Sequence, residues 1–196
     1  MDVTDLDADP LRQLGAWLDA AREAGAPMPE AMTIATASTG AVPSARLVVL
    51  RGLRGGLVFF TDGESDKAAE LVANPRAAAV LHWLSPVHRQ VRVAGAVSPV
   101  SEAEADEYWS RRSTAARITA AASHQSRVVA SREVLESRVR ELAAASSADL
   151  PRPQQWGGFR LRPERVEFWQ EAEDGLHDRF RYRRDDEGWV IERLSP

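Results

Sequence analysis

The residues of this chain that are best suited to bind a ligand are cations at the two ends of an apolar segment. Arg46 and Arg51 enclose Leu47-Val48-Val49-Leu50, and Thr61 and Lys67 follow further along. Lys67 is the only lysine among 25 basic residues. Two cations, a hydroxyl and the N–H groups at a helix start can together bind a phosphate monoester. A solvated strand surface could carry the same residues, so this cluster alone leaves both interpretations open.

A second cluster combines Arg89-Gln90-Val91-Arg92, at the start of an apolar segment, with Gln125-Ser126 in a polar stretch. A glutamine side chain both donates and accepts hydrogen bonds. Amides buried in a pocket can therefore recognise the polar edge of a heteroaromatic ring. The alternative is an edge strand with polar ends.

The third cluster is the densest in the chain. Glu167-Phe168-Trp169-Gln170 precedes Leu176-His177-Asp178-Arg179, which brings two aromatic rings, an imidazole, carboxylates and a guanidinium into one short stretch. A structural hydrogen bond is the commoner role for a single histidine. The surrounding group nevertheless favours a functional site around His177.

The elements that must position these clusters are mostly strands. Alternating or apolar runs bounded by turn residues predict nine of them. They are Met32–Ala37, Ala45–Arg51, Leu57–Thr61, Ala78–Leu84, Arg89–Val97, Gly158–Arg162, Arg165–Gln170, Phe180–Arg184 and Trp189–Leu194. The last two are joined by a turn at Asp185-Asp186-Glu187-Gly188.

Helices are predicted between these strands. Asp9 and Pro10 begin a docking helix that ends at Gly25, and Ser65 begins a short helix over Asp66–Ala73. Ser101 and Glu104 form a capping-box pattern for a helix to about Arg112. We expect residues 113–126 to be a loop with a short helix. A longer helix from about Ser131 to Ala145 carries Val134, Leu135, Val139 and Leu142 on one face.

This order of elements predicts an α+β protein that is mainly antiparallel β, a barrel with peripheral helices. We expect residues 1–196 to form a single domain, with 1–30 as an N-terminal tail and docking helix and 146–155 as an internal linker before the C-terminal strands. No dinucleotide-binding, P-loop or zincin motif occurs in the sequence.

Composition narrows the function further. The chain has 196 residues, no cysteine and a net charge of −4. Disulfides, thiolate metal sites and cysteine nucleophiles are thereby excluded, and the four histidines lack the spacing of a three-ligand metal site. The negative net charge argues against nucleic acid as a main partner. The absence of a signal-like start or a long apolar run predicts a cytoplasmic protein without a membrane partner.

In their order along the chain, these clusters resemble the pyridoxine/pyridoxamine 5′-phosphate oxidase family from Asp9 to Pro196. The resemblance rests on nine pieces. They are Arg46-Leu47-Val48-Val49-Leu50-Arg51, Val58-Phe59-Phe60-Thr61, Ser65-Asp66-Lys67-Ala68, Asn74-Pro75-Arg76-Ala77, Arg89-Gln90-Val91, Gln125-Ser126, Trp156-Gly157-Gly158-Phe159-Arg160, Glu167-Phe168-Trp169-Gln170 and Leu176-His177-Asp178-Arg179.

The resemblance implies an FMN-binding split β-barrel and a homodimer with FMN at the subunit interface. It also implies hydride transfer from a substrate carbon to the flavin, with O₂ as the final acceptor. The implied cofactor residues are Arg46, Leu47, Val48, Val49, Leu50, Arg51, Phe60, Thr61, Lys67, Gln90, Gln125, Ser126, Trp169 and Arg179, some from the second subunit. The implied substrate residues are Arg51, Tyr108, Arg112 and His177, with His177 and Arg179 as catalytic residues.

The chain departs from the family pattern mainly on the substrate side. Arg51 replaces a lysine, Ala116 replaces a serine, and Gly175 replaces an arginine that would lie over the substrate ring. Asp66 stands where an arginine often assists the FMN phosphate, and the short acidic N-terminus lacks a segment that closes over substrate in some relatives.

Three functions therefore remain open. The first is oxidation of pyridoxine or pyridoxamine 5′-phosphate to the aldehyde. The second, favoured by Gly175 and Ala116, is oxidation of another metabolite, as in the relatives of phenazine biosynthesis. The third, favoured by Asp66, is binding of a flavin or deazaflavin with little oxidase activity.

Overall fold

The fold is built on antiparallel strands that share one long central member. The computed structural model describes residues 1–145, 150–186 and 188–196. Its strands are β1 (Ala31–Ala37), β2 (Pro43–Val49), β3 (Leu57–Asp62), β4 (Arg76–Trp83), β5 (Arg89–Pro99), β6 (Trp156–Gln170), β7 (Asp178–Asp185) and β8 (Gly188–Arg193). The helices are η1 (Val3–Asp5), α1 (Pro10–Glu23), α2 (Asp66–Ala73), α3 (Glu102–Ser110), α4 (Thr114–Ala122) and α5 (Arg132–Ala145).

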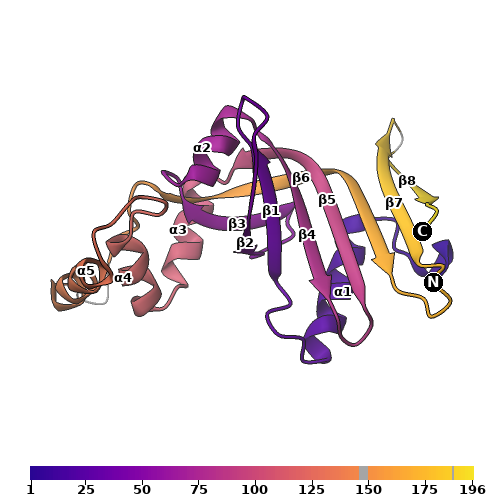
Figure 1. Ribbon diagram of the computed structural model, residues 1–196, viewed down its shortest axis with the longest axis horizontal. Coiled ribbons are helices and arrows are strands. Elements are labelled where there is room, and N and C mark those ends of the chain that lie inside the picture. The colour runs from indigo at the N-terminus through magenta and orange to yellow at the C-terminus, as the bar shows by residue number, and fades with distance from the viewer. Residues whose placement is uncertain (146–149, 187) are drawn as a thin grey trace.

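All strand pairs are antiparallel, as the sequence predicted. The sheet order is β2-β1-β4-β5-β6-β7-β8, and β3 pairs separately with the first part of β6. In Figure 1, β3 and β6 cross behind the upright strands β1, β4 and β5, which curves the sheet around its core. Because β6 pairs with β3, β5 and β7, it connects strands from both ends of the sequence.

β6 corrects the prediction of two separate strands. Residues 156–170 form one continuous strand that includes Pro163. The register with β5 shifts here: Ala94 pairs with Arg165 and Gly95 pairs with Pro163, so Glu164 is the extra residue of a β-bulge on β6. A Cβ on Gly95 would lie 1.9 Å from the backbone oxygen of Arg162, so the two backbones approach too closely for any other residue. The bulge lets β6 continue past Pro163, which has no N–H to donate.

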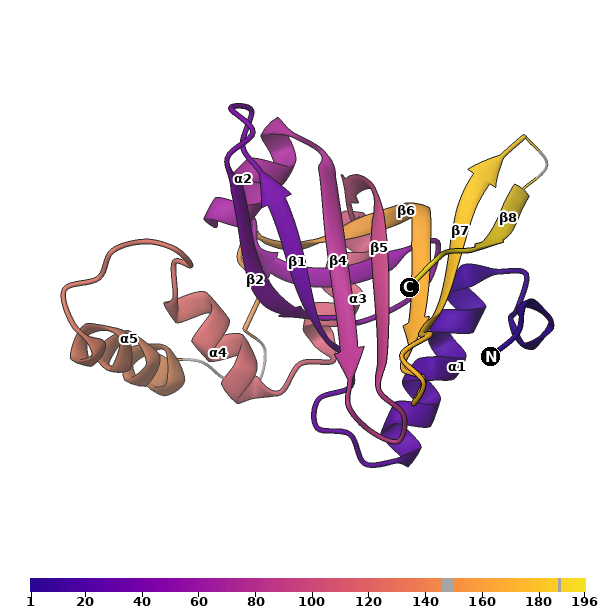
Figure 2. The ribbon, with the colours of Figure 1, turned by 45° about the vertical axis from the view of Figure 1, so that its right-hand side comes forward.

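α1 follows the prediction closely. The Asp9 carboxylate accepts a hydrogen bond from the Leu11 N–H at 2.8 Å, and Pro10 occupies the first turn. Gly25, with φ +70°, follows the end of the helix. The helix buries Leu14 and Trp17 against the sheet, and Figure 2 shows it beside β6.

Ser101 caps the start of α3, but the predicted capping box is only half formed. The Ser101 hydroxyl accepts from the Glu104 N–H at 3.2 Å. The Glu104 carboxylate instead accepts from Arg160 on β6 at 2.6 and 2.7 Å. An ion pair with the sheet has replaced the reciprocal cap.

The region from 113 to 145 contains α4 and α5. Residues 113–126 were predicted as a loop with a short helix, and α4 is that helix, which fills nine of them. The Ser113 hydroxyl caps it by accepting from the Ala116 N–H. α5 forms as predicted but buries none of its residues, because it packs on α4 at a distance from the sheet (Figure 1). Of the predicted linker, 146–149 lie outside the described residues, and 150–155 contain no helix or strand. Glu187 of the predicted turn also lies outside them.

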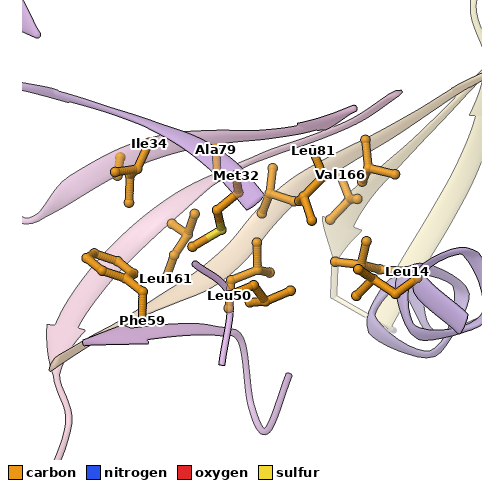
Figure 3. Packing of buried hydrophobic residues seen from close by; sticks show 14 of the residues in the cluster. Leu14, Met32, Ile34, Leu50, Phe59, Ala79, Leu81, Leu161 and Val166 are labelled. Carbon is orange, nitrogen blue, oxygen red and sulfur yellow. The ribbon is translucent and has the colours of Figure 1, made fainter. Parts of the chain in front are cut away.

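The core lies between α1, β3 and the inner face of the sheet. Figure 3 shows Met32 and Ile34 of β1, Leu81 of β4 and Leu161 of β6 converging on it with their neighbours. All four of these side chains are fully buried. Because successive side chains of a strand point to opposite faces, residues that alternate with the core residues point outward and can line a functional site.

Candidate functional site

The first group of predicted residues surrounds a cavity of about 300 Å³ between β2, β3 and α4. Its lining includes Leu47, Val48, Val49, Arg51, Phe60, Thr61, Lys67, Tyr108, Arg112, Gln125 and Trp156. We call this lining the Lys67 half-site. Trp156, which sequence reasoning did not single out, opens one of the family motifs.

Lys67 is the most informative residue of this half-site. Its Nζ donates to Thr61 Oγ1 at 3.1 Å, to Ser65 Oγ at 3.2 Å and to Gln125 Oε1 at 2.5 Å. Among the described residues, no carboxylate forms an ion pair with it. A buried ammonium group whose direct hydrogen-bond partners are all neutral oxygens is suited to bind an anionic group.

Burial and the nearby charge of Arg46 lower the pKa of Lys67, while Asp62, Asp66 and Glu70 act in the opposite direction. The predicted loop residues lie against it in the same protomer. Gln125 donates its N–H to Asp62, and the Ser126 hydroxyl accepts from the Asp66 N–H at 3.3 Å, at the start of α2.

Arg46, predicted to bind phosphate, is held in a neighbouring network and does not line the cavity. Its guanidinium donates to Thr36 Oγ1 at 2.5 Å, to Ser44, and to Glu70 Oε2 at 3.1 Å. The hydroxyls of Thr36 and Ser44, followed by Arg46, lower the pKa of Glu70. Leu50 lies in the hydrophobic core rather than in the cavity.

An aromatic stack forms one wall of the Lys67 half-site. The rings of Phe60 and Tyr108 are nearly parallel with centroids 4.0 Å apart, and Trp156 continues the stack 6.0 Å from Tyr108. Two guanidinium groups cover this wall: Arg51 lies 5.8 Å from the Tyr108 centroid and Arg112 lies 5.0 Å from that of Trp156.

The Arg112 guanidinium has a hydrogen-bond donor that no described residue uses. Its Nη2 donates to the Ala116 carbonyl at 3.0 Å, but its buried Nε has no hydrogen-bond partner within the described parts of the chain. Burial is the main cause that lowers the pKa of this guanidinium. A buried cation with an unused donor beside an aromatic wall is suited to an anionic group on a ring-shaped ligand.

The second group of predicted residues forms a row across the sheet. Gln90 on β5 pairs directly with Trp169 on β6, which pairs directly with Arg179 on β7. Directly paired residues point to the same face of a sheet, so the three side chains lie side by side. We call this row, together with His177, the Trp169 half-site.

His177 and Arg179 are held firmly in this half-site. The rings of His177 and Trp169 lie 4.9 Å apart, and His177 Nδ1 accepts from the Ala172 N–H at 3.2 Å. Arg179 donates to Glu167 Oε1 at 3.0 and 2.7 Å and to the Ser195 carbonyl at 2.8 Å.

The structure does not bring the two half-sites together within one protomer. Thr61 pairs with Gly157 and Gln90 pairs with Trp169, so the half-sites meet β6 at positions twelve residues apart. That separation is about 40 Å of strand at the usual rise per residue. The predicted grouping of Gln90 with Gln125 and Ser126 is therefore wrong for a single protomer.

The fold is a mainly antiparallel split barrel that carries a cavity lined by cations and, separately, a row that contains Trp169. The sequence of residues 18–146 matches the family model "Pyridoxamine 5'-phosphate oxidase", and 156–196 matches "Pyridoxine 5'-phosphate oxidase C-terminal dimerisation region". The chain thus belongs to the pyridoxamine 5′-phosphate oxidase family of FMN-dependent oxidoreductases, as its motifs predicted. The dimerisation region supports a homodimer, and it contains most of the Trp169 half-site.

Relatives and solved structures agree with this membership. The chain is 47% identical over its full length to a pyridoxine/pyridoxamine 5′-phosphate oxidase of Cupriavidus metallidurans, covering 93% of that protein. It is 47% identical to the Bordetella pertussis oxidase of the same name, with 96% of this chain and 90% of that protein covered.

Among solved structures, PhzG from Burkholderia lata, in complex with tetrahydrophenazine-1-carboxylic acid, superposes with a TM-score of 0.94 at 34% identity. The superposition covers 98% of this chain and 95% of PhzG. An FMN-binding protein of Nostoc punctiforme shares the fold, with a TM-score of 0.78 at 22% identity over 97% and 100% of the two chains. In the described part of this chain, none of the helices has the length and apolar character needed to cross a membrane.

Proposed function

We propose that this protein is an FMN-dependent oxidase that converts pyridoxine or pyridoxamine 5′-phosphate to pyridoxal 5′-phosphate, with O₂ as the electron acceptor. The observation that carries the proposal is the buried Lys67 ammonium, which has three neutral oxygen partners and no carboxylate partner among the described residues. Relatives that are 47% identical over nearly the whole chain bear the name of this oxidase.

The Lys67 half-site suits the phosphate end of FMN. Lys67 would supply the charge, Thr61 a hydroxyl, and the first N–H groups of α2 further donors. The Trp169 half-site, with Gln90 and Arg179, would contact the flavin from the other subunit. Both predicted sets of residues could then act on one cofactor, because a two-fold dimer can place opposite ends of two copies of β6 together.

The substrate phosphate would bind near Arg51, Tyr108 and Arg112. Arg112 Nε is a buried donor without a partner among the described residues, and a phosphate oxygen could accept from it. The Tyr108 ring, which is stacked on Phe60, provides a flat surface beside these cations. Arg51 keeps the charge of the family's lysine but presents a planar fork of donors.

Bound FMN would supply the hydride acceptor, and the chain's own residues would orient the substrate and stabilise charge. Because His177 Nδ1 accepts a backbone hydrogen bond, the neutral ring carries its proton on Nε2 and can donate from there to the substrate. Arg179, fixed by Glu167, would place a positive charge where electron density increases during reduction.

An anaerobic titration tests this function. Pyridoxine 5′-phosphate is added to the FMN-loaded protein while the flavin absorbance near 450 nm is followed. We expect bleaching that reverses when air is admitted, with pyridoxal 5′-phosphate as product. A flavin band that persists at saturating concentrations of both pyridoxine and pyridoxamine 5′-phosphate would refute the proposed substrate.

A second candidate function is oxidation of another metabolite, and Gly175 and the likeness to PhzG favour it. Gly175 has φ +77°, and a Cβ added to it would meet no atom within 4 Å, so a larger side chain has space but a strained backbone. If the phosphorylated pyridine is the substrate, Gly175→Arg should raise kcat/KM for it about 10- to 150-fold, because a charged hydrogen bond contributes about 1.5–3 kcal/mol.

Gly175→Ala is the matched control for that variant, since it carries the same backbone strain without the cation. Steady-state kinetics of both variants, with and without Ala116→Ser, measure the effect. An equal kcat/KM in the Arg and Ala variants would contradict the role of residue 175 in binding this substrate.

A third candidate is a flavin- or deazaflavin-binding protein with little oxidase activity. Asp66 motivates it, because this carboxylate stands beside Lys67 at the start of α2. Mass spectrometry of the cofactor that copurifies distinguishes the candidates: FMN supports the oxidase, whereas a deazaflavin supports the third function.

The lowered pKa of Lys67 predicts a pH dependence of FMN binding. A bound phosphate favours the ammonium form, so affinity should be lost as pH rises through the lowered pKa, at a pH below that of an exposed lysine. Fluorescence titrations of the apoprotein with FMN between about pH 7 and pH 10 measure this loss. In Lys67→Arg the loss should disappear, and identical profiles for the two proteins would contradict the assignment.

A further inference from the structure

Two histidines lie beside the Trp169 half-site, and the proposed oxidase reaction has no role for them. His82 on β4 pairs directly with Gln90, so it stands at the end of the row formed by Gln90, Trp169 and Arg179. His88 lies in the β4–β5 hairpin. The two Nε2 atoms are 2.8 Å apart; His82 is exposed to solvent and His88 is partly exposed. We call these residues the histidine pair.

Glu171 fixes the proton arrangement of this pair. Its Oε2 lies 3.2 Å from His88 Nδ1, and its N–H donates to the His88 carbonyl at 3.0 Å. Because a carboxylate accepts, His88 carries its proton on Nδ1 and directs the Nε2 lone pair toward His82. The hydrogen between the two Nε2 atoms therefore belongs to His82.

We propose that the histidine pair binds a divalent transition-metal ion, such as Cu²⁺ or Zn²⁺, in place of that shared hydrogen. A carboxylate that accepts from one ring nitrogen while the other faces the metal is a common arrangement around metal-bound histidines. Metal–nitrogen distances near 2.0–2.1 Å in a tetrahedral site require the two nitrogens to separate by only about 0.5 Å. Both side chains have room for this movement because they lie at the surface.

The number of protein ligands determines how tightly and how selectively the histidine pair should bind a metal ion. No three His, Asp or Glu side chains converge on one point in the described ranges, so water would complete the coordination. We therefore expect a moderate affinity that follows the general order for nitrogen ligands, with Cu²⁺ bound more tightly than Zn²⁺. Binding should weaken below about pH 6, where imidazoles become protonated.

The ion would lie next to the proposed flavin contact. The centroid of the His88 ring is 4.9 Å from that of Trp169, and the His177 ring lies at the same distance from Trp169. A metal ion bound to the histidine pair would thus hold the His88 ring in place beside Trp169. The binding itself does not depend on the proposed oxidase function, because every residue that holds the ion is present in the apoprotein.

The test is a calorimetric titration of tag-free, chelator-treated protein with CuCl₂ and with ZnCl₂. Wild-type protein should bind one ion per protomer, and His82→Ala and His88→Ala should each weaken binding at least tenfold. Glu171→Gln should weaken it less than either. His124→Ala, which removes an exposed histidine elsewhere, is the control and should bind as wild type.

Electron paramagnetic resonance of the Cu²⁺ complex provides a direct readout, because two imidazole nitrogens should split the signal in wild type and one in each single variant. Circular dichroism verifies that the variants are folded. Equal affinity in wild type and both alanine variants, or a signal without nitrogen splitting, would overturn the proposal.

Discussion

Lys67→Ala should purify largely without colour and bind FMN about 10- to 150-fold more weakly than wild type. A hydrogen bond to a charged group contributes about 1.5–3 kcal/mol, and this substitution removes the only ammonium that lines the cavity. Fluorescence quenching of FMN by the apoprotein measures the dissociation constant. The ratio of absorbance at 450 nm to that at 280 nm gives the cofactor content as purified.

Two comparisons separate binding from folding. Because Lys67 is buried without a carboxylate partner among the described residues, Lys67→Ala should leave the thermal unfolding temperature of the apoprotein unchanged or raised. Arg54→Ala removes a cation outside the cavity and should retain FMN. Full flavin retention in Lys67→Ala would refute the placement of the phosphate at this residue.

The largest effect on stability is expected for Phe168→Ala. Phe168 is fully buried on β6, with its ring centroid 5.0 Å from that of Trp17 and 5.4 Å from that of Tyr182. Truncating a buried phenylalanine costs about 3–5 kcal/mol through lost burial and the cavity left behind. Urea unfolding at a fixed protomer concentration measures the free energy of unfolding.

Phe168→Leu provides a graded control, since it keeps most of the apolar volume and should cost less. Leu176→Ala is a second control, because this leucine is 69% exposed and should change stability by under about 0.5 kcal/mol. A loss below about 1 kcal/mol in Phe168→Ala would mean that α1 does not pack on β6 as described.

Local signals in the sequence were sufficient for elements whose ends are marked by capping or turn residues. α2 spans the predicted residues, since Ser65 and the Asn74-Pro75 pair mark its two ends. β6 could not be predicted as one strand, because a proline normally interrupts pairing, and the bulge at Glu164 that accommodates it depends on pairing with β5, which is distant in sequence. The uncovered face of α5 was also unpredictable, since periodicity shows that a face is apolar and not what covers it.

The site was predicted as residue types but not as an arrangement. Lys67, Thr61 and Gln125 meet in one hydrogen-bond network, a grouping that the sequence clusters did not predict. Arg46 is bound to Glu70, a residue that no motif singled out. His82 became relevant only through its strand register opposite Gln90. Register and long-range ion pairs depend on tertiary packing, and neighbouring residues in the sequence carry little information about them.

The length of β6 has a thermodynamic consequence for the dimer. With one half-site at each end of this strand, a two-fold dimer would form two equivalent cofactor sites, each sharing residues from both subunits. Cofactor binding and subunit association would then be linked by mass action. Added FMN should shift the monomer–dimer equilibrium toward dimer, and dilution should release cofactor and dissociate subunits over the same concentration range.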